Sequence, residues 1–370
     1  MVRTNFKKTI KKDEGVALLL TLVFIVLLTA LVFDFTYEMQ VEATLMDKAS
    51  KNREALLAAK SGLATALSVL NADLEENENQ SGSGGSLAIY DNQNEPWAEP
   101  ATVMQFGDAI ANVTIVDEHG KFNLNAIFYL DEQGNEQIHP LMGEILALML
   151  DNSREWYDVS PLDAILDWLD EDDEQREYGA ETDYYEDLDV PYVSKNGPMD
   201  SIEELLLIPG ITPEIYFGRE DFEEVPLFEL MTVHGHPEGR ININTAPELV
   251  LDAFLSTASP DSGKALDDVL GERESDTYLQ YANLIENKLV RQDPATPADS
   301  GDEGRGGGGP LPEPAWDMYQ VYSKVFRIRS DVQHFDTRVR LEAYAYRQTD
   351  RTQGDPERQL FRIIDWRIMQ

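Results

Sequence analysis

Residues 16–33 read VALLLTLVFIVLLTALVF, an unbroken run of uncharged side chains near the amino terminus. As a helix rising ~1.5 Å per residue, this run can cross the ~30 Å hydrocarbon core of a bilayer. Five basic residues precede it: Arg3, Lys7, Lys8, Lys11 and Lys12. By the positive-inside rule, this flank stays in the cytoplasm and the chain after Asp34 lies on the other side. The sequence therefore predicts a single membrane span from Val16 to Phe33.

The helical pattern continues beyond the apolar run. A secretory signal would have a shorter apolar core and a small-x-small cleavage site, which the segment from Leu31 to Asp34 lacks. Apolar residues instead recur at an approximately helical spacing among charged ones, with no proline or glycine before Gly62. We predict one helix from about Val16 to Ala72, half in the membrane and half amphipathic outside it. The alternative is a plain signal anchor with a coiled-coil stalk.

Composition narrows the function classes. The 370 residues include 69 Asp and Glu against 30 Lys and Arg, a formal net charge of -39 that disfavours binding to nucleic acid. The chain has no cysteine, which excludes disulfides and thiolate chemistry. Its length exceeds the usual size of one hydrophobic core, so we expect two folded units.

The amino terminus resembles a type IV prepilin leader over the segment KKDEGVALLL, residues 11–20. The resemblance implies that a prepilin peptidase cuts between Gly15 and Val16 and methylates Val16. Most members of that family have a glutamate at the fifth mature position, where this chain has Leu20. A carboxylate inside a bilayer costs several kcal/mol (~2.5–3.5) unless it is paired, and in pilins it is thought to pair with a neighbour's terminal amine. The absence of this acid fits a subunit placed first, at a fibre tip.

Further motifs resemble the K-type minor pseudopilins of type II secretion systems and span most of the chain. They are residues 120–125 (GKFNLN), 167–173, 180–185, 191–198, 201–205 (SIEEL) and 241–247 (ININTAP). On these the chain is identified as a member of that family. The resemblance implies an inner-membrane anchor with a periplasmic body, and I- and J-type minor pseudopilins, the major pseudopilin and prepilin peptidase as partners. It also implies a role in capping or initiating the pseudopilus that exports folded proteins across the outer membrane.

The expected fold class is α+β: a long amino-terminal helix with a pilin-like antiparallel sheet, interrupted by a large insertion. Alternating or β-rich stretches predict the strands, and polar residues 71–100 predict a surface loop. The predicted strands are residues 109–116, 121–125, 321–332, 338–347 and 359–368.

Helix-start signals predict an all-α insertion between these strands. Ser160-Pro161 is a typical start, and Ser201 with Glu204 has capping-box spacing. Residues 207–212 resemble a helix-hairpin-helix turn, so the insertion is expected to be SAM-like or helix-hairpin-helix-like; its acidic neighbours indicate a structural hairpin rather than a DNA site. The predicted boundaries are a leader at 1–15, helix and first sheet part at 16–125, insertion at 126–291, flexible linker at 292–314 and remaining strands at 315–370.

A dense acidic stretch predicts calcium binding. Residues 151–189 contain sixteen acids, offset by Arg154 and Arg176. Four acids match positions 1, 3, 5 and 12 of a calcium loop, but Gln175 replaces the glycine that an EF-hand needs at position 6. The K-type resemblance implies a calcium-binding helical domain, so we expect a non-EF site, with a solvated acidic face as the alternative. The candidate ligands are Asp170, Asp172, Asp173 and Glu181, with Asp183 as a further one.

The sequence carries no recognisable enzyme motif. It lacks Gly-x-Ser-x-Gly, His-Glu-x-x-His and phosphate-loop patterns, and no third zinc ligand accompanies His234 and His236. We therefore predict that the protein is not an enzyme. Two other functions stay open: a minor pilin of a type IV pilus or competence system, and a membrane-tethered periplasmic calcium-dependent hydrolase.

Overall fold

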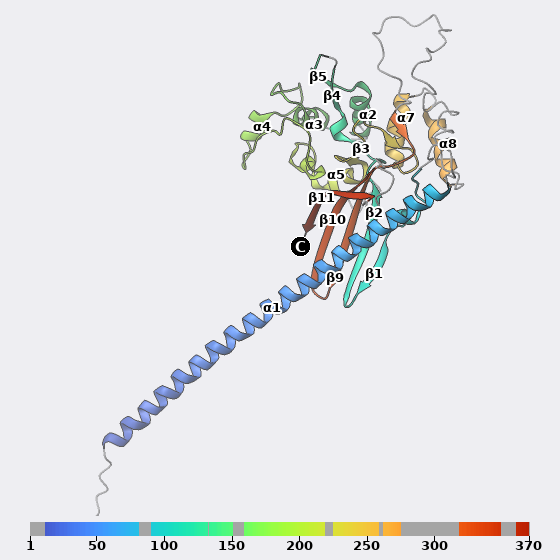
Figure 1. Cartoon of the computed structure of the whole chain (residues 1–370). Helices are drawn as coiled ribbons and strands as arrows, with labels where there is room; N and C mark the ends of the chain where they lie inside the picture. Colours follow the sequence, from blue (N-terminus) through green and yellow to red (C-terminus); the bar gives the residue numbers. More distant parts are fainter. Residues whose placement is uncertain are drawn as a thin grey trace, which may run out of the picture.

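The computed structural model describes residues 12–80, 90–131, 133–150, 159–218, 225–258, 262–274, 318–348 and 360–369. One helix, α1 (Lys12–Gln80), forms the axis of the molecule, and its amino-terminal half projects free of all other elements (Figure 1). Its most apolar 18-residue window has none of its residues buried. The predicted span from Val16 to Phe33 thus belongs to an exposed apolar helix of sufficient length to cross a membrane.

The outer half of α1 packs on a five-stranded antiparallel sheet, and together they form what we call the sheet unit. The strand order is β1 (Thr102–Phe106), β2 (Ala109–Asp117), β9 (Val325–His334), β10 (Thr337–Arg347) and β11 (Phe361–Met369). The helix face that meets the sheet is made of small residues and leucine: Ala55, Ala58, Ala59, Ala66 and Leu70. The helix and the sheet approach closely at Gly62. A Cβ added there would lie 2.5 Å from the Ser330 hydroxyl oxygen of β9, so only glycine fits without a shift of its neighbours. The strands predicted at 109–116, 338–347 and 359–368 are confirmed within a few residues.

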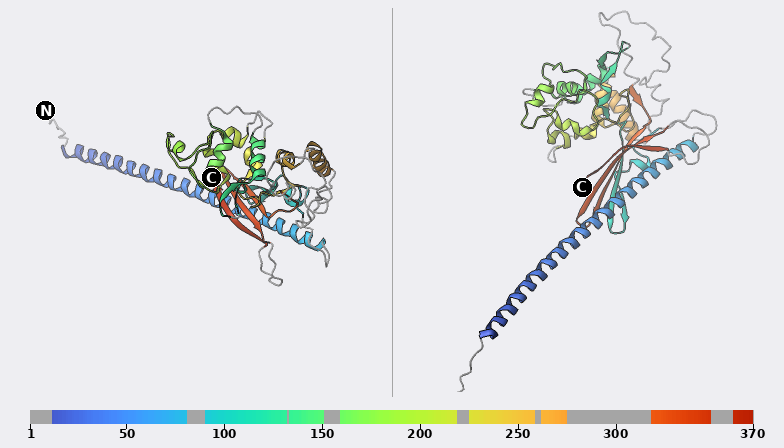
Figure 2. Two further views of the ribbon diagram at one scale, coloured as in Figure 1. Left: turned by 90° about the horizontal axis from the view of Figure 1, so that it is seen from above. Right: turned by 60° about the vertical axis from the view of Figure 1, so that its left-hand side comes forward.

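The second unit, the inserted unit, lies at the end of α1 remote from the apolar half (Figures 1 and 2). Its helical elements are η2 (Leu124–Ala126), α2 (Pro140–Leu150), α3 (Pro161–Leu169), α4 (Thr182–Glu186), η3 (Ile202–Leu207), α5 (Pro213–Phe217), α6 (Leu227–Leu230), α7 (Glu248–Ala258) and α8 (Ser262–Glu274). Its core is separate from that of the sheet unit, and it includes Phe122 before the predicted insertion boundary and Val321 after it.

The insertion is not entirely helical, which corrects the all-α prediction. A hairpin pairs β4 (Phe128–Leu130) with β5 (Glu136–Ile138), and its turn is set locally because the Asp131 carboxylate accepts backbone hydrogen bonds from residues 133 and 135. Two short parallel pairs join distant segments. They are β3 (Phe122–Asn123) with β6 (Met231–Thr232), and β7 (Ile241–Asn242) with β8 (Tyr319–Gln320). Such two-residue strands depend on tertiary contacts and leave no alternating pattern.

The predicted loop at residues 71–100 is also wrong in its first part, because α1 continues to Gln80. Leu74 is 4% exposed and follows buried Leu70 by one helical turn, so burial extends the helix past the predicted end at Ala72. A short helix, η1 (Pro96–Ala98), occupies the end of the same stretch. Residues 1–11, 81–89 and the predicted linker 292–314 lie outside the described residues.

Ion pairs from β11 connect the two units. Arg367 donates from Nη2 to Glu342 of β10 and from Nη1 to Glu203 of η3, each at 2.6 Å. The Glu342 carboxylate is almost fully buried and also accepts from Arg329 at 3.1 Å. A buried carboxylate without partners is strongly unfavourable, so Glu342 keeps Arg367 in place. The same guanidinium pairs with Glu203 and so attaches η3 to the sheet.

Candidate metal site

Three buried carboxylates meet where α3 ends and α4 begins. Asp167 and Asp170 lie in the last turn and at the end of α3, and Glu181 is the residue before α4. One oxygen of each lies within 4.8 Å of the others, and the three residues are 0%, 3% and 4% exposed. The i, i+3 spacing in a helix places the two aspartates on one face. The loop between α3 and α4 then folds back over this face and places Glu181 beside them.

That return passes very close to Asp167. A Cβ added at Gly179 would lie 1.9 Å from Asp167 Oδ2, so the backbone fits against the carboxylate only because residue 179 has no side chain. Gln175 Nε2 donates to the Gly179 carbonyl at 2.8 Å and holds the loop in place. The local sequence therefore builds a tight wall around the three acids.

One cation contacts two of the three carboxylates. Arg176 Nη1 donates to Asp167 Oδ1 and to Asp170 Oδ2, both at 2.5 Å. Within the part of the chain that the structure describes, Asp170 Oδ1 and both oxygens of Glu181 are buried and accept no hydrogen bond. The site thus has two more negative charges than positive ones when all three acids are ionised, and three oxygens available to a ligand.

The electrostatics follow from this imbalance. Burial, then the charges of Asp167 and Asp170, raises the pKa of Glu181 to about 7. Burial raises the pKa of Asp170 to about 6, although Arg176 opposes the change. The pKa of Asp167 is also raised by burial, against the same guanidinium. A divalent cation with a preference for hard oxygen ligands would favour the ionised forms.

The structure divides the predicted ligands into two groups. Asp170 and Glu181 belong to the buried cluster, whereas Asp172, Asp173 and Asp183 are exposed and lie outside it. The exposed aspartates order the loop instead. Asp172 Oδ1 accepts from the Glu174 amide at 2.7 Å, and Asp173 Oδ1 accepts from Asn196 Nδ2 at 2.8 Å.

Asp167 is the cluster member that sequence reasoning did not name as a ligand. It stands within the apolar helical pattern of α3, where an acid is usually assigned to the exposed face. The available signal was its position among buried neighbours, since Leu166, Trp168 and Leu169 are also buried in α3, but the structure was needed to show that Asp167 itself is buried.

The predicted processing and anchoring residues lie on α1. Gly15, Val16 and Phe33 are all within this helix, and Leu20 is 52% exposed on its apolar part. An exposed apolar helix that continues into a small-residue face beneath an antiparallel sheet agrees with the pilin-like arrangement expected from the sequence.

Comparison with known proteins finds similarity to one family. Residues 120–218, which contain the whole carboxylate cluster, match the family model described as type II secretion system protein K. Type II secretion system protein K of Aeromonas hydrophila is 28% identical over 214 residues, 56% of this chain and 61% of that protein. The Pectobacterium carotovorum protein of the same name is 29% identical over 177 residues, 46% of this chain and 52% of its own length.

A solved structure supports the fold. The crystal structure of the GspK-GspI-GspJ complex from enterotoxigenic Escherichia coli contains a chain similar over 88% of this one and 99% of its own length, with a TM-score of 0.57 and 19% identity. By these comparisons the chain is similar to protein K of type II secretion systems, and the similarity supports a minor pseudopilin. The chain spans only about half to three-fifths of the length of the two curated relatives described above.

Proposed function

We propose that this protein caps or initiates the tip of the pseudopilus, which exports folded proteins from the periplasm across the outer membrane. The observation that carries the proposal is the position of the inserted unit at the outer end of α1, away from its exposed apolar half (Figure 2). Subunits of a helical fibre stack above and below one another. A unit of this bulk would obstruct a subunit stacked above it, but not one below.

Partners and processing form part of the same proposal. The similar Escherichia coli chain is in a complex with GspI and GspJ. We extend this to I- and J-type minor pseudopilins as neighbours, with the major pseudopilin below them in the fibre. Burying apolar surface between helices gains ~25 cal/mol per Å², which can drive docking of the exposed α1 faces without nucleotide. Prepilin peptidase would first cut between Gly15 and Val16 and methylate Val16, leaving a single inner-membrane span and a periplasmic body.

We also propose that the cluster of Asp167, Asp170 and Glu181 binds calcium. The donor set fits, because all three residues offer carboxylate oxygens, the hard ligands that Ca²⁺ takes. The three buried oxygens without a hydrogen-bond partner supply the coordinating positions. The role is structural and not enzymatic: the ion would offset the excess negative charge and hold the loop between α3 and α4.

Deletion and complementation test the function. Deleting the gene should abolish secretion of the exported enzymes and leave twitching and DNA uptake intact; the reverse result would indicate a type IV pilus or competence pilin. Activity of the isolated protein on hydrolase substrates would favour the membrane-tethered, calcium-dependent hydrolase. Mass spectrometry of the membrane-extracted protein should find N-methylated Val16 as the first residue, and an intact leader would contradict the proposed processing.

A further inference from the structure

A pocket lies at the junction of the two units, and we call it the junction pocket. Its volume is ≈ 860 Å³, within the range of ~300–1,000 Å³ typical of ligand sites. The sheet unit contributes η1 with its flanks and the end of β2, and the inserted unit contributes Glu229, Thr245 and Pro247. Any ligand in it would therefore contact both units.

The pocket wall is predominantly acidic. Its carboxylates are Glu95, Glu99, Asp117 and Glu229, and its only lining cation among the described residues is Lys121. The Lys121 ammonium is already paired, because Nζ lies 2.6 Å from the buried Glu118 carboxylate. The positive charge of this lysine is therefore not available to the acids of the pocket.

The acids differ in how firmly they are held. Asp117 is fixed, since its Oδ2 accepts from Ser323 and Thr245 at 2.5 Å and from Asn242 at 3.1 Å. Glu99 and Glu229 are exposed. The pocket wall therefore has one carboxylate held in place by hydrogen bonds, Asp117, and two that are exposed to solvent, Glu99 and Glu229.

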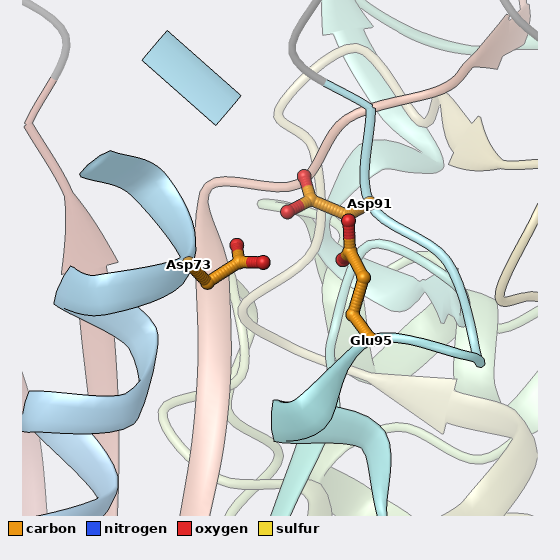
Figure 3. A group of neighbouring side chains, drawn as sticks. All are labelled: Asp73, Asp91 and Glu95. Carbon is orange, nitrogen blue, oxygen red and sulfur yellow. The ribbon is translucent and has the colours of Figure 1, made fainter. Parts of the chain in front are cut away.

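Glu95 joins the pocket to a second carboxylate group, formed with Asp73 of α1 and Asp91 (Figure 3). Arg347 is the resident cation of this group: its Nη2 and Nη1 donate to Asp91 at 2.7 and 3.0 Å, and Asp73 lies at 4.0 Å. Glu95 Oε2 accepts from Trp97 Nε1 at 2.6 Å and from the Asn92 amide at 3.2 Å. Among the described residues, Arg347 therefore pairs with two of the three carboxylates and acts on Glu95 only through space.

The proton balance of Glu95 follows. Burial, then the charges of Asp73 and Asp91, raises the pKa of Glu95 to about 8, so it keeps a proton at neutral pH. A cationic group placed on the pocket side would replace that proton, because it supplies the positive charge that the shared guanidinium does not.

We propose that the junction pocket binds an arginine or lysine side chain carried by an extended segment of a partner polypeptide. Charge complementarity selects the cation. The remaining wall fits the flanking chain, because Pro96, Pro100 and Pro247 offer rigid apolar surface. This binding goes beyond the proposed capping role and would fix the inserted unit relative to the sheet.

The test uses the full 370-residue chain in detergent and a fluorescein-labelled pentapeptide, Gly-Leu-Arg-Leu-Gly, with Gly-Leu-Glu-Leu-Gly as its counterpart. Fluorescence anisotropy should show at least ~10-fold tighter binding of the arginine peptide. Its affinity should rise about 10-fold from pH 6.5 to pH 9, the effect of one pKa unit at Glu95. Arginine keeps its charge throughout this range.

Matched variants identify the groups. Glu95→Gln keeps the hydrogen-bond acceptor for Trp97 but has no proton to lose, so most of the rise with pH should disappear. A smaller rise should remain, because burial lowers the pKa of Lys121 to about 8 and its charge is lost over the same range. Glu229→Gln should weaken binding, and Glu144→Gln, an exposed site on α2, should not. Equal thermal melting of all variants would establish that they are folded.

Three results would overturn the proposal. They are equal affinity for the two peptides, an unchanged pH dependence in Glu95→Gln, and displacement of the arginine peptide by an equimolar concentration of spermidine, which would indicate a free amine as the ligand.

Discussion

Replacing Glu181 with Gln should change stability in opposite directions with and without calcium. In the absence of the ion, the folded protein must ionise a buried carboxylate whose pKa is raised from 4.5 to about 7. A raised acid pKa means that stability is full below pH 4.5 and is lost as pH rises through 7. At ~1.4 kcal/mol per pKa unit, the loss is at most ~3.5 kcal/mol. Glutamine has no proton to lose, so the variant in chelator at pH 8 should be ~1–3 kcal/mol more stable than the parent.

Calcium should reverse this order. Free calcium at 1,000 times its dissociation constant stabilises the native state by ~4.1 kcal/mol, which exceeds the variant's advantage in chelator, and the variant has lost one charged ligand. In urea unfolding at pH 8, we expect the variant to have the larger free energy of unfolding in EDTA and the parent to have the larger one in calcium. The exposed Glu186 of α4 supplies the control, since Glu186→Gln should leave both curves unchanged. The reasoning is refuted if Glu181→Gln destabilises the protein in EDTA, or if calcium stabilises parent and variant equally.

Further predictions concern packing, the bridge between units and the anchor. Gly62→Ala should lower stability by ~1–3 kcal/mol in urea unfolding, because its Cβ would lie 2.5 Å from a β9 hydroxyl; Gly271→Ala, in a helix with open space around it, should instead be neutral or stabilising by up to ~1 kcal/mol, and equal effects at the two sites would contradict the packing. Arg367→Met should cost ~2–4 kcal/mol and separate the unfolding of the two units in calorimetry, whereas a single unchanged transition would argue against the bridge. Leu20→Glu should reduce the carbonate-resistant membrane fraction, since an unpaired acid within the span costs up to ~2.5–3.5 kcal/mol, the value at the bilayer centre. Undiminished insertion and secretion would argue against the tip position.

The main architecture could be predicted from the sequence because its signals are long and local. The apolar run at residues 16–33 predicts α1, and alternation over residues 338–347 predicts β10. The separation into two cores was also expected, since the chain is longer than a single core usually allows. These features need no knowledge of distant contacts.

The parts that could not be predicted depend on tertiary structure. The pairing of β3 with β6 joins residues 122 and 231, and neither two-residue strand has a period of its own. The continuation of α1 to Gln80 occurs in an acidic, asparagine-rich segment, where burial of Leu74 outweighs local preference. For the metal site, the high density of acids in residues 151–189 predicted the right region of the chain. The order of these acids in the sequence did not reveal which of them are buried. Asp167 became a candidate only from its complete burial.

Gold labelling of the protein on isolated pseudopili is the most direct test of the proposed tip position. An epitope tag can replace part of residues 292–314, and filaments overproduced with the major pseudopilin can be imaged by electron microscopy. The capping role predicts one cluster of gold at a single end of each filament. Label distributed along the shaft would contradict it.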